Sequence, residues 1–206
     1  LQIGTREAHR PFRHEPFERE GVYIPPWLAD EPSAREDLSG FQGDLHALDS
    51  VIGSTLDKLA GSGRAENTLF IFLSDHGIPF PRAKHSLYEP GCQITAVLRW
   101  PERGWTGGQK LDSLHSGVDL LPTILEALQI PSPGTIQGTS FAPLLDGDKY
   151  KERTAVFTEQ SFNAWTDVSR AVRTRRYKLI ANFTPGRGFS DSTQEWRPPV
   201  RVRFLK

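Results

Sequence analysis

The sequence of 206 residues contains a single cysteine, Cys92, and no methionine. One cysteine cannot form an intrachain disulfide, and it excludes a Cys-x-x-Cys motif for metal binding or redox chemistry. The chain also lacks an apolar run of about eighteen residues, which excludes a membrane-spanning helix. An excess of charge of one sign is missing too, because 25 Lys and Arg residues balance 25 Asp and Glu residues. Without a dense basic block that alternates with aromatic residues, nucleic acid is not a favoured partner.

The length of the chain permits one sizeable α/β domain with a core of its own. The chain begins with Leu rather than Met, and Leu1–Gly4 has the pattern of the last part of a strand. We therefore interpret the sequence as a fragment of a longer protein.

The junction at residues 69–77 is the most informative part of the chain. Residues 69–73 are all apolar, which is typical of a strand buried on both faces of a parallel sheet. Asp75 and His76 follow directly, and Gly77 allows a tight turn. Open parallel sheets place their chemistry at the carboxyl ends of strands, so a carboxylate and an imidazole would face one crevice there. The sequence predicts a metal-binding corner at this point.

The pattern around this junction predicts a sheet flanked by helices. Ser33–Glu36 has the form of a capping box, and apolar residues then recur at helical spacing as far as Gly61. A long loop at 78–90 returns as a strand at 93–99, and a second helix is expected at about 118–128. Antiparallel strands are expected at 154–158 and 171–183, in a smaller subdomain.

Lys84 lies four residues before Tyr88-Glu-Pro-Gly91 in the loop that follows the junction. In this order and at this spacing, Ser74-Asp-His-Gly77, Lys84 and the Tyr-Glu-x-Gly turn resemble the second half of the sulfatase family. The segment Glu7-Ala-His9-Arg-Pro11 is similar to the family's Asp-Pro-His-Arg-Pro turn. The segments Asp75-His-Gly-Ile-Pro-Phe-Pro81 and Leu87-Tyr-Glu-Pro-Gly91 look closest to the heparan N-sulfatase (sulfamidase) branch.

The resemblance extends from about Glu7 to about Phe183, and it implies the fold. Similar segments are those that begin at Val118, Gly138 and Arg170. The implied architecture is a partial α/β, alkaline-phosphatase-like mixed sheet flanked by helices. Residues 1–148 would be the C-terminal part of the catalytic domain, and residues 149–206 the start of a small antiparallel C-terminal subdomain.

The resemblance also implies roles for individual residues. A divalent cation, calcium in most members, would take Asp75 as an oxygen ligand, and His76 would be a second ligand or would hydrogen-bond the sulfate. Lys84 would place positive charge on the sulfate. His9 would contact the leaving atom as its proton donor. The catalytic residues would thus be His9 and Lys84, with His9, Lys84 and His76 binding the substrate, a sulfated small molecule or glycan.

One departure from the family is equally informative. Sulfatases attack with a formylglycine made from Cys/Ser-x-Pro-x-Arg, and neither this motif nor the Asp-Asp pair of further metal ligands is present. Cys92 has no proline or arginine at the required offsets, so we interpret it as a small packing residue at the start of a core strand. The nucleophile is expected upstream of this chain, and the intact protein is expected in the periplasm or outside the cell.

Other interpretations remain open from the sequence. Asp-His-Gly after a strand is commonly an ordinary turn, His9 could be a loop histidine, and Lys84 could be a solvated surface lysine. A metal-dependent phosphomonoesterase or phosphodiesterase of the same superfamily is an alternative function. A truncated product without catalytic activity is another.

Overall fold

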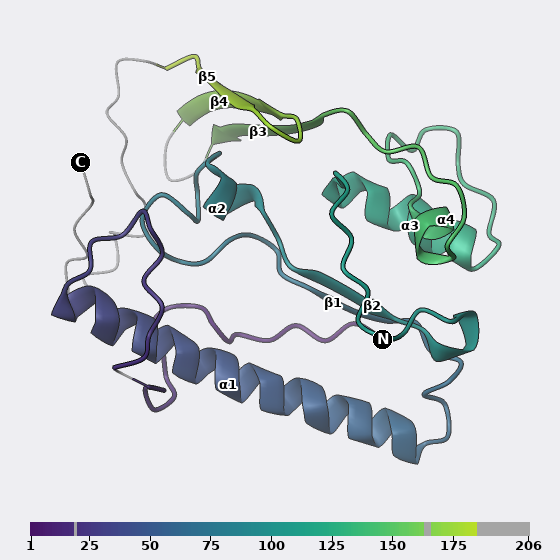
Figure 1. Cartoon of the computed structure of the whole chain (residues 1–206), viewed down its shortest axis with the longest axis horizontal. Coiled ribbons are helices and arrows are strands. Elements are labelled where there is room, and N and C mark those ends of the chain that lie inside the picture. Colours follow the sequence, from purple (N-terminus) through teal and green to yellow (C-terminus); the bar gives the residue numbers. More distant parts are fainter. Residues whose placement is uncertain (19, 163–165, 185–206) are drawn as a thin grey trace. The chain divides into compact units, whose positions relative to one another are not determined.

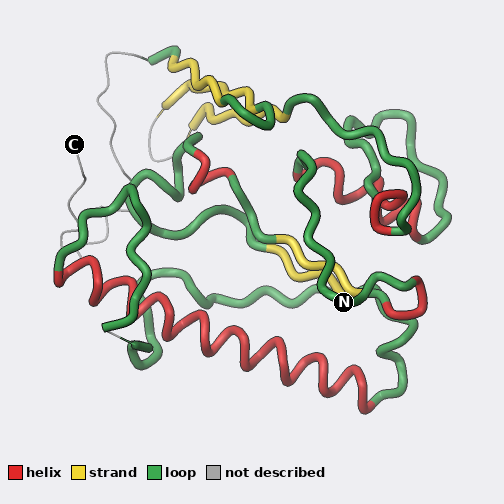
Figure 2. Tube along the Cα trace, in the orientation of Figure 1, coloured by secondary structure: helices red, strands yellow, loops and turns green. Residues whose placement is uncertain are grey.

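The computed structural model of the chain describes residues 1–18, 20–162 and 166–184 (Figure 1). Outside its helices and strands the described chain is mostly loop, including all residues before the first helix and most of residues 74–88 (Figure 2). The elements in chain order are α1 (Pro32–Gly61), β1 (Phe70–Leu73), α2 (Glu89–Cys92), β2 (Ala96–Arg99), the 3₁₀ turns Pro101–Arg103 and Gly117–Asp119, α3 (Leu120–Ala127), α4 (Ala142–Leu145), β3 (Val156–Phe162), β4 (Thr166–Arg173) and β5 (Lys178–Asn182).

The described residues form two compact units. Residues 1–65 and 74–94 belong to the first unit, and residues 66–73 and 95–184 to the second. The sequence-based boundary between residues 148 and 149 follows a different principle, similarity to a family, and stays a prediction. None of the helices in the described part is long and apolar enough to cross a lipid bilayer.

Helix α1 is the main element of the first unit, and it begins differently from the prediction. It starts at Pro32, one residue after an extended Glu31, and no side chain caps its first turn. The capping box expected at Ser33–Glu36 is therefore wrong. Proline at the first helical position starts the helix instead, because its fixed φ suits the helix and its missing N–H would be unpaired there anyway. The end at Gly61 agrees with the sequence.

The core of the first unit joins α1 to the loop that carries Lys84. Leu38 of α1 packs with Val22, Leu28 and Phe80, and Phe80 is completely buried. Phe80 and Phe41 of α1 meet edge to face with ring centroids 5.5 Å apart. Edge-to-face aromatic pairs contribute about 1 kcal/mol beyond their buried area. The loop is thus anchored to the helix four residues before Lys84.

Strand β1 lies where the apolar run predicts a strand, but its pairing differs from the expectation. It pairs antiparallel with β2, with Phe70 opposite Arg99 and Leu73 opposite Ala96. Its residues are half-buried, and Leu73 is 44% exposed. The expectation of a parallel strand covered on both faces is therefore wrong for the described chain. Leu1–Gly4 is in no strand, contrary to prediction.

The second unit contains the predicted antiparallel subdomain. Strand β4 lies between β3 and β5, and both pairings are antiparallel. Helix α3, which covers most of the predicted span, follows a 3₁₀ turn capped by Ser116 and Asp119. Asp119 is fully buried and forms a bidentate ion pair with Arg153. Residues 185–206, which the family resemblance assigns to the C-terminal subdomain, lie outside the described residues.

Candidate active site

The loop from Gly77 to Gly91 is built on close backbone contacts. The Gly77 N–H donates to the Gly91 carbonyl at 3.1 Å. A Cβ atom on Gly77 would lie 1.7 Å from the carbonyl oxygen of Pro90, and one on Gly91 would lie 2.1 Å from that of Ala83. Both distances are far below any van der Waals contact, so only glycine fits at either position. The Tyr-Glu-Pro-Gly turn thus closes the loop.

Lys84 is held by the backbone of this loop. The backbone N–H of Lys84 donates to the Ile78 carbonyl at 3.0 Å. Arg82 and His85, on either side of it, have left-handed φ values of 61° and 63°. Non-glycine residues adopt this conformation rarely, and they do so often at functional sites. The backbone around Lys84 is therefore tightly specified.

The side chains of Lys84 and Asp75 interact electrostatically. Burial lowers the pKa of the Lys84 ammonium below its ordinary value, and the carboxylate of Asp75 offsets part of this effect by raising the pKa. Asp75 lies two residues after the end of β1, with its side chain 88% exposed. Folding therefore brings together a half-buried cation and an open carboxylate that are nine residues apart in sequence.

His76 lies beside Asp75 with its two ring nitrogens in different roles. Nδ1 is 2.7 Å from the carbonyl oxygen of Gly77. A carbonyl can only accept, so Nδ1 carries the proton and Nε2 presents its lone pair in the neutral ring. Nε2 lies 3.5 Å from the Asp75 carboxylate. An unprotonated nitrogen and a carboxylate oxygen at this spacing can be neighbouring ligands of one cation.

These two donors alone do not make a metal site. Among the described residues there is no group of three or more His, Cys, Asp or Glu side chains that could hold a metal ion. Calcium takes six to eight oxygen ligands. Asp75 fits such a cation by its charge and exposure, whereas the nitrogen of His76 is a softer donor that fits it less well.

His9 is exposed and its ring is oriented by the next residue. Its Nδ1 lies 2.7 Å from the Arg10 carbonyl oxygen and therefore donates to it. Its backbone N–H donates to the Arg6 carbonyl at 2.8 Å. With the proton on Nδ1, Nε2 of the neutral ring carries the lone pair that a proton-transferring imidazole needs.

Arg10 joins the segment of His9 to the loop of Lys84, a role that the sequence did not reveal. Its Nε donates to the Pro79 carbonyl at 2.9 Å. Its two terminal nitrogens form a bidentate pair with the Asp37 carboxylate of α1, one of them at 2.7 Å. The sequence holds one signal for this pair. Asp37 lies four residues before Phe41, so it is on the apolar face of the helix, where an acidic residue needs a partner.

Cys92 and three further histidines have structural contacts. Cys92 is half-buried at the end of α2, with Sγ 3.6 Å from the Ser86 carbonyl oxygen. Its location in a short helix corrects the expectation that it begins a strand. His14 is paired with Asp44 of α1, and His46 stacks on a phenylalanine ring. His115 is 2.8 Å from a serine hydroxyl, and burial lowers its pKa.

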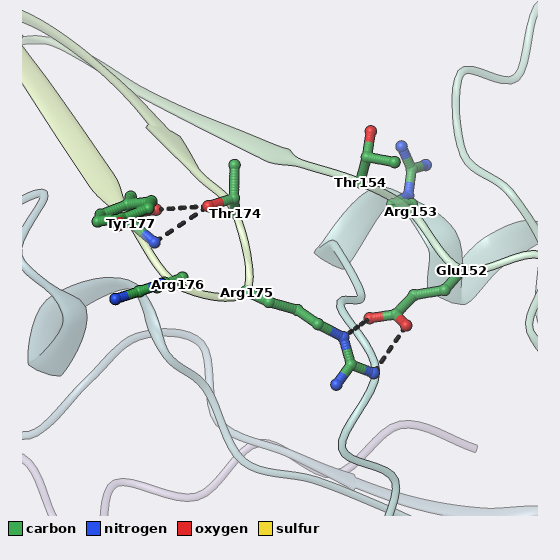
Figure 3. Close-up of a pocket in the computed structure, with 7 residues that line it drawn as sticks. All are labelled: Glu152, Arg153, Thr154, Thr174, Arg175, Arg176 and Tyr177. Atoms are coloured by element: carbon green, nitrogen blue, oxygen red, sulfur yellow. Dashed lines mark hydrogen bonds and ion pairs between the residues drawn. The ribbon is translucent and has the colours of Figure 1, made fainter.

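A separate cavity of about 490 Å³ lies in the second unit (Figure 3). It is lined by residues 152–154 and 174–177. Arg175 reaches the carboxylate of Glu152 with two hydrogen bonds of 2.8 and 2.7 Å, while Arg153 points away from them. The basic side chains do not converge on a common point, so this cavity is not an alternative to the site at Lys84.

The first unit thus presents a lysine, a carboxylate and two histidines on loops, one of which packs against α1, in a chain whose helices and strands make it an α/β protein. The chain belongs to the sulfatase family. The family profile described as "Sulfatase" matches residues 1–130. A profile described as "N-sulphoglucosamine sulphohydrolase, C-terminal" matches residues 79–190.

Two curated relatives support this assignment. An ulvan-active sulfatase of Formosa agariphila is 33% identical over 168 residues, which are 81% of this chain and 27% of that protein. The human N-sulphoglucosamine sulphohydrolase is 31% identical over 184 residues, which are 84% of this chain and 36% of that protein. The chain therefore spans well under half the length of these relatives.

Solved structures confirm the expected fold class. A 2-O GAG sulfatase superposes with a TM-score of 0.62 at 22% identity, over 88% of this chain and 45% of that chain. A phosphonate monoester hydrolase of Silicibacter pomeroyi superposes with a TM-score of 0.63 at 21% identity, over 77% and 34%. At this level of identity the similarity concerns the fold alone.

Proposed function

We propose that this chain supplies the anion-binding and proton-transfer part of a sulfatase active site, and that the protein hydrolyses a sulfate ester or an N-sulfamate on a glycan. The observation that carries the proposal is the interaction of the Lys84 ammonium with the Asp75 carboxylate, two residues after a strand. Family membership and the names of the two relatives, an ulvan-active sulfatase and an N-sulphoglucosamine sulphohydrolase, support it.

In this proposal Lys84 and His9 act on opposite ends of the bond that breaks. The Lys84 ammonium binds sulfate oxygens and stabilises negative charge that moves toward the leaving atom. His9 is a proton donor in its imidazolium form, with one N–H held by the Arg10 carbonyl and Nε2–H directed to the leaving oxygen or nitrogen. The leaving atom departs neutral once it has received this proton.

Asp75 and His76 would hold a divalent cation, with Ca²⁺ as the first candidate. Such a cation would neutralise sulfate oxygens when bound. Asp75 would be its carboxylate ligand. His76, with Nδ1–H fixed on the Gly77 carbonyl, would offer Nε2 either to the cation or, when protonated, to a sulfate oxygen. The other ligands would come from residues outside this chain.

The cation hypothesis can be tested without turnover. Sulfate is titrated into the wild type and Asp75→Asn, each with EDTA and with excess Ca²⁺, and the NMR shifts of Lys84 are followed. Without a cation, removal of the carboxylate should strengthen sulfate binding, because a negative charge beside the anion is lost. With Ca²⁺ the order should reverse. The same order in both conditions would contradict a cation at Asp75.

The nucleophile of this reaction would lie outside the chain, as a formylglycine made from a Cys/Ser-x-Pro-x-Arg segment. The 206-residue chain alone should therefore not hydrolyse an aryl sulfate. A longer protein that joins such a segment to this chain should do so, and Lys84→Ala should lower its kcat/KM by about 100-fold or more. Turnover by the chain alone, or full activity of the variant, would contradict the proposal.

A phosphomonoesterase or phosphodiesterase is the second candidate, favoured by the fold shared with a phosphonate monoester hydrolase. Lys84 would bind phosphoryl oxygens by the same charge interaction. Parallel assays of the longer protein with aryl sulfate and aryl phosphate separate the two reactions. A higher kcat/KM for the aryl phosphate would favour the phosphatase reaction over the sulfatase reaction. Inactivity toward both substrates would favour a protein without catalytic function.

A further inference from the structure

We propose that Arg10 is the positioning residue that holds His9 and the Lys84 loop in one site, and this rests on the function proposed above. Three elements meet at its guanidinium: the segment before α1, the helix itself and the loop at residues 77–91. The guanidinium binds both oxygens of Asp37 on α1, and its Nε–H donates to the Pro79 carbonyl.

The environment of Arg10 excludes direct contact with a substrate. The side chains of Arg10 and Asp37 are only 13% and 10% exposed. The guanidinium carbon lies 4.6 Å from the ring centroid of Phe12 and 4.8 Å from that of Phe80. With its guanidinium over two rings and its nitrogens hydrogen-bonded, Arg10 can act only through the residues that it holds.

Arginine is specific for this position because of its shape. A planar guanidinium can form two parallel bonds to a carboxylate while a third N–H points to a carbonyl and the faces contact aromatic rings. Lysine has the same charge, but its ammonium cannot stack on the rings or form the bidentate pair. Arg10→Lys therefore keeps the positive charge but loses the bidentate pair and the stacking on the rings.

Through its contacts Arg10 fixes the positions of both catalytic candidates, His9 and Lys84. His9 precedes Arg10 in the chain, and its ring is hydrogen-bonded through Nδ1 to the Arg10 carbonyl. Pro79 is five residues before Lys84, whose N–H is bonded to the carbonyl of Ile78 next to Pro79. A displacement of about 1 Å in an active site can reduce the rate about 100-fold. Fixing Pro79 thus fixes the base of the Lys84 loop.

The test uses Arg10→Lys and, as a matched control, Arg35→Lys. Arg35 also forms a bidentate pair, with Asp30, but this pair is exposed and does not involve the 77–91 loop. Amide hydrogen exchange of the whole chain is measured, with global stability determined by urea unfolding. In Arg10→Lys the protection of the Lys84 amide should fall about 10-fold or more, beyond any loss in the middle of α1. In Arg35→Lys it should remain within 2-fold of the wild type.

The outcomes separate this inference from the function on which it rests. Equal loss of protection at Lys84 and in the middle of α1, or equal effects of the two variants, would overturn the positioning role. If Arg10→Lys does not fold, Asp37→Glu is measured in the same way, with the same expected loss at Lys84. In the active longer protein, Arg10→Lys should lower kcat/KM about 10- to 100-fold and Arg35→Lys less than 2-fold. Local loss of protection in a protein without sulfatase activity would keep the positioning role and reject only the reaction.

Discussion

Burial lowers the pKa of the Lys84 ammonium while the Asp75 carboxylate raises it, so the protonation of Lys84 depends on Asp75. Asp75 follows a strand, and Lys84 is held by the backbone of the loop between Gly77 and Gly91. The protonation of Lys84 can therefore be measured in the 206-residue chain by itself.

Asp75→Asn should lower the pKa of Lys84 further below its ordinary value. The carboxylate favours the ammonium form, and its removal leaves burial unopposed. The ¹³Cε shift of Lys84, followed against pH, gives the pKa directly. Asp57→Asn, at an exposed position of α1, is the control and should leave this titration unchanged.

Sulfate binding at Lys84 should weaken at alkaline pH, and earlier than at an ordinary lysine. Only the ammonium form binds the anion, and the pKa of Lys84 is lowered from its ordinary value. The affinity should therefore fall as the pH rises through the lowered pKa of Lys84. Calorimetric titration at a series of pH values gives the midpoint. An affinity that declines only where free lysine titrates would disprove the lowered pKa.

Lys84→Met should stabilise the folded chain while it abolishes sulfate binding. Because the folded protein lowers the pKa of Lys84, the charged form is disfavoured by folding, and an apolar side chain of similar length avoids this cost. Urea unfolding at pH 7 should show an increased free energy of unfolding.

The exposed Lys58 in the last turn of α1 is the matched position for this experiment. Lys58→Met should change the free energy of unfolding by no more than about 0.5 kcal/mol and leave sulfate binding intact. A destabilised Lys84→Met would indicate that Lys84 has a structural role.

The sequence predicted the local elements better than their partners. Helix α1, the strand before Asp75 and the antiparallel subdomain follow from short-range patterns, and the structure contains them. The antiparallel pairing of β1 with β2 could not be predicted, because an apolar run does not specify which strand lies beside it.

Arg10 illustrates the same limit at the candidate site. His9, Asp75 and Lys84 are found by motif and spacing, whereas the function of Arg10 depends on an acid 27 residues away on a helix. Asp37 and Asp44 lie seven residues apart on α1, and both bind the segment that precedes the helix. Acidic residues near an apolar stripe indicate buried partners, but the stripe does not identify them.

Gly77→Ala should destabilise the first unit by about 1 to 3 kcal/mol or more, since the new methyl group would overlap the Pro90 carbonyl. The obstructing atom belongs to the backbone, so the loop itself must move and the bond from Gly77 to Gly91 is lost. Gly53→Ala is the control, because no atom lies within 4 Å of its added Cβ in α1. It should instead stabilise the chain by about 0.5 to 1 kcal/mol. Urea unfolding of both variants gives the comparison.

Asp119→Asn should destabilise the second unit strongly at neutral pH and less in acid. Burial alone would raise the pKa of Asp119, but Arg153 and the N–H groups of Thr139 and Ser116 bind its carboxylate and bring the pKa below its ordinary value. A carboxyl group with a lowered pKa in the folded state contributes stability above its unfolded pKa of about 4, and this stability is lost as the pH falls through the folded pKa. Removing one member of a buried ion pair costs about 3 to 5 kcal/mol. We expect this difference in unfolding free energy at pH 7 and a smaller one below pH 4.

The control for this prediction is Asp112→Asn, at a residue whose side chain is 77% exposed and lies 3.8 Å from Lys110. It should show neither the loss of stability at pH 7 nor a dependence of that loss on pH. A difference that does not depend on pH would mean that Asp119 acts through its shape and hydrogen bonds rather than its charge.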